Sequence, residues 1–166
     1  LCEAQVSAAK GAPRPDVVAH LEQAVQGDPQ SLTAWSLLAE NYQALADANK
    51  SKADSAKVVE AMKQMLRIAP SNQKMRESIF KYLLQAGKPN VAREVADEGL
   101  KIDPNNWELY DLKSNACLFQ SDFKCAIDAL AQAYAIDSTR ADSSFYKKIA
   151  VAAAQQAELR PSGEAL

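Results

Sequence analysis

Apolar residues recur along this chain at the three- and four-residue spacing that places side chains on one side of a helix. After Pro15 they are Val17, Val18, Leu21, Ala24 and Val25, and near the end of the chain they are Phe145, Ile149, Ala152 and Ala153. Extended runs of alternating β-branched residues are missing from the sequence. The pattern therefore predicts an all-α fold.

Similar short segments punctuate the helical stretches at a fixed interval. Residues 66–72 (LRIAPSN), 100–106 (LKIDPNN) and 134–140 (YAIDSTR) follow one another at 34 residues, and residues 25–31 (VQGDPQS) are an earlier copy. Proline cannot continue a helix, and a neighbouring Asp, Ser or Asn can cap the next one. Each repeat is therefore predicted to be a helical hairpin.

The period and its key residues resemble the tetratricopeptide-repeat (TPR) family. Its pattern of Trp-x2-Leu-Gly-x2-Tyr, Ala-x3-Phe and Pro corresponds here to Trp35, Leu38, Tyr42, Val58, Met62 and Pro70, with Ala39 in place of the small Gly. The next unit keeps Ile79, Leu83, Gly87, Ala92, Gly99 and Pro104, and the third keeps Tyr110, Ser114, Ala126, Leu130 and Ala133. The second unit departs at Phe80, where a small residue is usual, and the third replaces its proline with Ser138. The resemblance implies a right-handed α-solenoid of about three full repeats with flanking helices.

This register divides the single predicted domain, residues 1–166. The parts are the second helix of a partial first repeat at 15–27, repeats at 32–72, 73–106 and 107–140, a capping helix at 141–158 and a tail at 159–166. The first full repeat is seven residues longer than the period, so we expect longer helices or a protruding turn around residues 46–54. Residues 1–10 are too short to be a full first helix. We therefore expect the chain to begin inside a repeat and the native polypeptide to extend upstream.

Small residues at fixed repeat positions are expected to allow close helix packing, namely Ala92, Gly99, Ala126 and Ala133. The aromatic residues Trp35, Tyr42, Trp107 and Tyr110 are expected in the core or between repeats. For the last helix two alternatives stay open. Polar side chains on residues 147–158 could solvate the end of the array, or residues 149–151 could dock a neighbouring subunit.

Charge and composition exclude several classes of partner. The chain carries 19 Lys and Arg against 21 Asp and Glu, so no strong field for nucleic acid or anionic lipid is expected. Its strongly apolar stretches, such as residues 149–154, are far shorter than the roughly 20 residues that span a bilayer, so direct membrane insertion is not expected.

Candidate catalytic chemistry is sparse. The single histidine, His20, has no cysteine or carboxylate cluster at metal-ligand spacing around it, and no phosphate-binding glycine loop occurs. We expect a non-catalytic chain without metal or cofactor.

Cys117 and Cys125 fall on facing helices of the third hairpin. Eight residues across a tight turn allow a disulfide, and two unpaired thiols are the alternative. A disulfide would indicate a periplasmic or other extracytoplasmic location, whereas free thiols would indicate the cytoplasm.

The resemblance implies a concave groove, formed by the first helix of each hairpin, that binds a peptide or protein segment. Family positions carried onto this sequence are Thr33, Ser36, Glu40, Gln43, Lys74, Glu77, Lys81, Gln85, Glu108, Asp111, Asn115, Phe119, Asp142 and Phe145. The family's carboxylate clamp is absent, because Ser36, Glu40, Glu77, Lys81 and Asp111 occupy its places. The acidic bias toward Glu108, Asp111 and Asp142 favours a partner with basic or polar segments.

The leading functional hypothesis is therefore a protein-interaction scaffold. The alternative is a structural subunit held permanently in a multiprotein complex through its flanks and termini.

Overall fold

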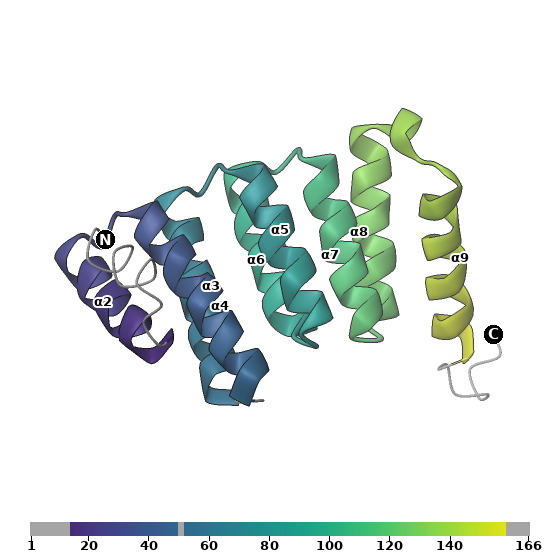
Figure 1. The fold of residues 1–166 in the computed structure, drawn as a ribbon. Coiled ribbons are helices and arrows are strands. Elements are labelled where there is room, and N and C mark those ends of the chain that lie inside the picture. Colours follow the sequence, from purple (N-terminus) through teal and green to yellow (C-terminus); the bar gives the residue numbers. More distant parts are fainter. Residues whose placement is uncertain (1–13, 50–51, 159–166) are drawn as a thin grey trace. The chain divides into compact units, whose positions relative to one another are not determined.

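The computed structural model describes residues 14–49 and 52–158, and all regular structure in these two ranges is helical. The all-α prediction is confirmed (Figure 1). Residues 1–10, Cys2 and the tail at 159–166 lie outside the described residues, as does part of the predicted insertion.

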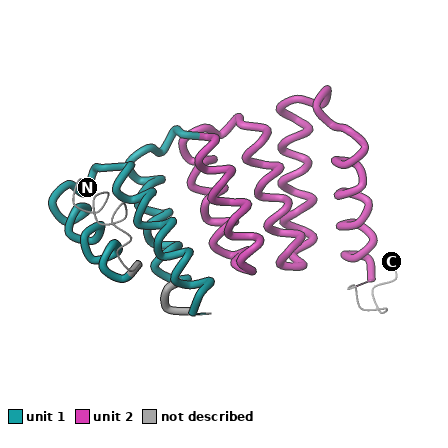
Figure 2. The backbone as a smooth tube through the Cα atoms, viewed as in Figure 1, with its two compact units in different colours: residues 1–72 teal, residues 73–166 magenta. Residues whose placement is uncertain are grey.

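The helices form two compact units, divided after Asn72 (Figure 2). The first contains α2 (Arg14–Gly27), α3 (Leu32–Asn49) and α4 (Lys52–Ile68). The second contains α5 (Gln73–Gln85), α6 (Pro89–Ile102), α7 (Trp107–Phe119), α8 (Phe123–Ile136), the 3-10 helix η1 (Ser138–Arg140) and α9 (Ser143–Glu158). Within each unit, every α-helix packs against the next along the chain.

Local capping explains where several helices begin. The side chains of Ser31, Asn106 and Asp122 each accept a hydrogen bond from the backbone N–H three residues later, at distances of 3.3, 3.1 and 3.1 Å. These bonds satisfy N–H groups that have no partner inside the helix. Gly87 makes the α5–α6 turn at a φ of +68°, a conformation that glycine adopts without a steric penalty.

The first unit contains the two longest helices, α3 with 18 residues and α4 with 17. The corresponding α5 and α6 have 13 and 14, so longer helices accommodate the extra residues of the first full repeat. Leu21, Leu38 and Val58 contribute one fully buried side chain from each helix of this unit.

The second unit packs through the small residues that the repeat pattern singled out. Ala92, Gly99, Ala126 and Ala133 are all buried, which confirms their packing role. At Gly99 an added Cβ would lie 2.9 Å from side-chain atoms of both Arg76 and Leu109, so no larger residue fits without movement. Arg76 is itself buried, and its guanidinium donates to the Val95 carbonyl at 2.8 Å.

The α7–α8 hairpin is joined by its two cysteines. In the structure Cys117 and Cys125 are bonded through sulfur, with their Cα atoms 5.8 Å apart. Cys117 is fully buried beside Ala126 and Ala152. Of the two alternatives that the sequence left open, the structure contains the disulfide.

The repeat register changes before α9. The first residues of α5 and α7, Gln73 and Trp107, are 34 positions apart, but α9 begins at Ser143, 36 positions after α7. The proline of the earlier repeats is replaced here by Ser138, and the η1 turn occupies the extra length. Each residue of α9 therefore corresponds to the α7 residue 36 positions earlier in the sequence, and not to the one 34 positions earlier.

Candidate partner-binding surface

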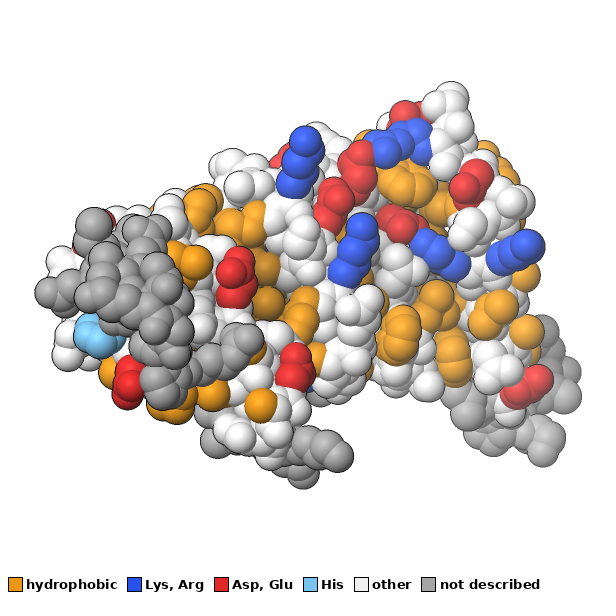
Figure 3. All heavy atoms as spheres, viewed as in Figure 1, with side chains coloured by type: hydrophobic (Ala, Val, Ile, Leu, Met, Phe, Trp, Pro, Cys, Tyr) orange, Lys and Arg blue, Asp and Glu red, His pale blue; other side chains and the backbone are white. Residues whose placement is uncertain are grey.

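The candidate surface in the second unit is formed by α5, α7 and α9, which we call the A-helix surface. Helices α5 and α7 are in direct contact although α6 separates them in sequence. Acidic and basic side chains lie against one another over this surface instead of gathering by sign (Figure 3). The charge that the A-helix surface offers to a partner therefore depends on which of its charged side chains are already paired within the chain.

The two acidic residues of α7 are paired within the chain. Glu108 accepts a hydrogen bond from Arg140 at 2.5 Å, and Asp111 accepts one from Lys148 of α9, also at 2.5 Å. The hydrogen bond from Arg140 lowers the pKa of Glu108. Asn115 donates to the second Asp111 oxygen at 3.3 Å. Both carboxylates therefore already contact cations, which weakens the acidic character expected of this surface, and the preference for a partner with basic or polar segments stays a prediction.

Two further predicted groove positions have other roles. Asp142 caps α9 by accepting the Phe145 backbone N–H at 2.8 Å, as Asn106 caps α7. Phe145 is only 2% exposed and packs beside Leu130 and Ala133. Its placement on the groove wall was wrong, because the 36-residue spacing gives Phe145 the core position of Leu109.

Most of the other predicted groove positions of the second unit are exposed to solvent, and none of the exposed side chains is acidic. Lys74, Lys81 and Gln85 are exposed along α5, and no ion pair of either lysine is found among the described residues. Glu77 is partly buried and accepts a bond from Gln73 at 3.3 Å. Phe119, at the end of α7, is 65% exposed. The exposed side chains at these predicted positions are therefore two lysines, one amide and one aromatic ring.

The first unit contributes the α3 positions of the prediction. Thr33 and Glu40 are exposed, whereas Ser36 and Gln43 are partly buried. The Gln43 amide donates to Asp47 at 2.7 Å, and its buried oxygen has no hydrogen-bond partner in the structure. These four residues are predominantly neutral and polar.

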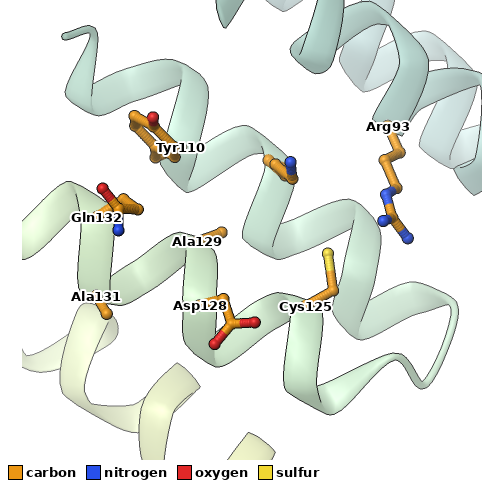
Figure 4. Close-up of a pocket in the computed structure, with 8 residues that line it drawn as sticks. Arg93, Tyr110, Cys125, Asp128, Ala129, Ala131 and Gln132 are labelled. Carbon is orange, nitrogen blue, oxygen red and sulfur yellow. The ribbon is translucent and has the colours of Figure 1, made fainter. Parts of the chain in front are cut away.

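Sequence reasoning missed two clefts that lie between the second helices of successive hairpins. In the second unit a cleft of about 490 Å³ lies over α7 between α6 and α8, with Arg93, Tyr110, Cys125, Asp128 and Gln132 in its lining (Figure 4). In the first unit a cleft of about 290 Å³ lies over α3 between α2 and α4 and includes Trp35 and Tyr42. The sequence singled out Trp35, Tyr42 and Tyr110 for their repeat spacing and Cys125 for a possible disulfide, and none of these signals indicates a cleft.

The cations beside the second-unit cleft are paired. Arg93 contacts Asp122 at 3.0 Å, and Lys113 contacts Asp97 at 2.7 Å. These pairs join α6 to the start of α8 and to α7, so they contribute to the packing of the hairpins.

His20 has a local role. Its Nδ1 donates to the Asp16 carbonyl one helical turn earlier, at 2.8 Å, and the ring is partly exposed. In the described ranges, no helix has the length and apolar character required to cross a membrane.

Comparison with known proteins gives similarity at the level of fold. No protein-family model matches the sequence, and no curated protein matches it. Among solved structures, a MamA protein is 12% identical and aligns over 93% of this chain and 79% of its own, with a TM-score of 0.56. YrrB, described as a TPR protein with an unusual peptide-binding site, is 14% identical over 95% of this chain and 76% of its own, also with a TM-score of 0.56. The Sgt2 TPR domain from Aspergillus fumigatus is 16% identical over 77% of this chain and 87% of its own, with a TM-score of 0.54. The chain therefore has the tetratricopeptide-repeat fold that its sequence pattern predicted.

Proposed function

We propose that this chain is a non-catalytic scaffold that binds a peptide or protein segment along the A-helix surface, mainly over α5 and α7. The observation that carries the proposal is the set of accessible groups there. Lys74 and Lys81 lie seven residues apart on one side of α5 and are exposed, and Phe119 is exposed on α7. The fold is shared with YrrB, a protein described as having a peptide-binding site.

The chemistry of these groups favours an acidic segment with an apolar side chain. The lysines offer charge-assisted hydrogen bonds to carboxylates, and the Phe119 ring offers apolar contact area. The acidic groups of α7 do not oppose such a segment strongly, because Arg140 and Lys148 already neutralise them. This proposed preference differs from the sequence-based expectation of a partner with basic or polar segments.

A random peptide library selected on the purified chain tests the proposal. We expect the enriched peptides to combine Asp or Glu with a large apolar residue. In fluorescence anisotropy, the double variant Lys74→Glu and Lys81→Glu should raise their Kd by about tenfold or more, because two attractive charges become repulsive. Phe119→Ser should also weaken binding, with salt dependence unchanged.

A matched control uses Lys101→Glu and Lys124→Glu. These lysines are exposed on α6 and α8 and change the net charge by the same amount. Equal loss in the control would mean that peptides respond to overall charge and not to the A-helix surface. Failure of the library to yield any binding peptide would contradict the proposed function.

A further inference from the structure

The side of α9 that faces away from α8 carries four exposed residues at helical spacing. Lys147, Val151, Ala154 and Glu158 follow one another at four, three and four residues, so they form one stripe, which we call the outer stripe of α9. Val151 is the largest aliphatic side chain of the stripe and is 56% exposed. The buried residues of α9, Phe145 and Ala152, lie on the opposite side of the helix.

The equivalent stripe of α7 is a packing surface. Thirty-six residues before Lys147, Val151 and Ala154 lie Asp111, Asn115 and Leu118. Asp111 is paired with Lys148 of α9, and Leu118 packs against the cluster that contains Ala152. The repeat therefore uses these positions to contact a further helix. Among the described residues, no helix covers the outer stripe of α9, as the view of the last helix indicates (Figure 1).

The order of residues in the outer stripe makes it complementary to itself. In an antiparallel pair related by a twofold axis between Val151 and Ala154, Lys147 of one copy lies opposite Glu158 of the other. Val151 then lies opposite Ala154, so a larger side chain meets a smaller one. Both contacts occur twice by symmetry, as an isologous interface requires.

The adjacent row of α9 consists mostly of small side chains. Tyr146, Ala150, Ala153 and Ala157 are all exposed, and three of these four side chains are alanines. Small side chains allow two helices to approach closely. Glu158 can still accept a hydrogen bond from a second copy, because Gln155 donates to only one of its carboxylate oxygens, at 3.1 Å.

We infer that the outer stripe of α9 pairs with the same stripe of a second copy of this chain, in an antiparallel twofold dimer. One helix face is smaller than the roughly 800 Å² per partner of a standard interface, so the dimer is weak and depends on concentration. Its specificity comes from the two Lys147–Glu158 pairs and not from area.

Analytical ultracentrifugation across a concentration series tests this pairing through charge reversal. Lys147→Glu and Glu158→Lys each place like charges opposite one another twice, so each single variant should weaken self-association by about tenfold. An equimolar mixture of the two variants restores both attractive pairs, and so does the double variant. Both should therefore dimerise as well as the original chain. Lys124→Glu on α8 serves as the control and should leave self-association unchanged.

Three results would overturn the inference. The chain could remain monomeric up to about 1 mM, and a helix of another protein would then be the alternative partner for the stripe. The single variants could dimerise normally, which would place the interface elsewhere. The mixture could fail to associate although circular dichroism shows that both variants are folded, which would exclude the antiparallel register.

Discussion

Lys148 of α9 donates to the Asp111 carboxylate of α7 across 2.5 Å, and the two side chains are only 21% and 22% exposed. The residues are 37 positions apart in sequence, so the pair joins two helices that the chain does not connect directly. Partial burial reduces screening by water, and for this reason the pair is worth more than an exposed surface pair.

Removal of either partner should therefore destabilise the second unit. We expect Lys148→Met and Asp111→Asn each to cost about 1–2 kcal/mol, because one partly buried group loses its partner. Urea unfolding of both variants and the double variant should give a coupling energy of about 1 kcal/mol. Lys147→Met, on the neighbouring exposed position, is the control and should change dilute-protein stability by less than about 0.5 kcal/mol. A coupling energy near zero would show that the contact has no energetic role.

The space beside Gly99 predicts a second stability effect. Gly99→Ala places a methyl group 2.9 Å from Arg76 and Leu109 side-chain atoms, so these groups must move. We expect a loss of about 1–3 kcal/mol in the free energy of unfolding. Gly27→Ala is a matched control, because nothing lies within 4 Å of its added Cβ, and it should cost no more than about 0.5 kcal/mol. Equal costs at the two glycines would contradict the packing argument.

The Glu108–Arg140 pair predicts a dependence on pH. The folded state lowers the pKa of Glu108, mainly through the hydrogen bond from Arg140, so the ionised carboxylate stabilises folding above its unfolded pKa of about 4.3. This contribution disappears as pH falls through the folded pKa. Glu108→Gln should lower stability at pH 7 by less than about 1 kcal/mol, because the side chains are about two-fifths exposed. The variant and the original chain should converge in acid, and a constant difference down to about pH 3 would refute this origin.

The Cys117–Cys125 bond predicts a response to reductant. Native, unreduced protein should alkylate at neither cysteine, and both should react after reduction and unfolding. Closure of so short a loop contributes about 2.5 kcal/mol in the chain-entropy account, so Cys117→Ala with Cys125→Ala should lower stability by about that amount. Such a bond persists in an oxidising compartment, and we therefore expect an extracytoplasmic location. Mass spectrometry that finds both thiols alkylated without reductant would remove the basis for this location.

The helical hairpins and their packing residues could be predicted because their signals are local. Pro70 and Pro104 end repeats through steric limits on their own backbone, and Asn106 caps α7 from the adjacent residue. The burial of Ala92, Gly99, Ala126 and Ala133 follows from the 34-residue repeat, which is visible in the sequence. These features depend on a few neighbouring residues, and the sequence by itself determined them.

The candidate surface depended on tertiary structure, because its charges are paired over long sequence distances. Glu108 and Asp111 find their cations 32 and 37 residues away, and no local pattern indicates which cation will reach which carboxylate. The η1 turn shifts α9 by two residues, which moves Phe145 from the predicted groove wall into the core. A shift of two residues rotates a helical position by more than half a turn, so only the folded arrangement decided which side chains of α9 face a partner.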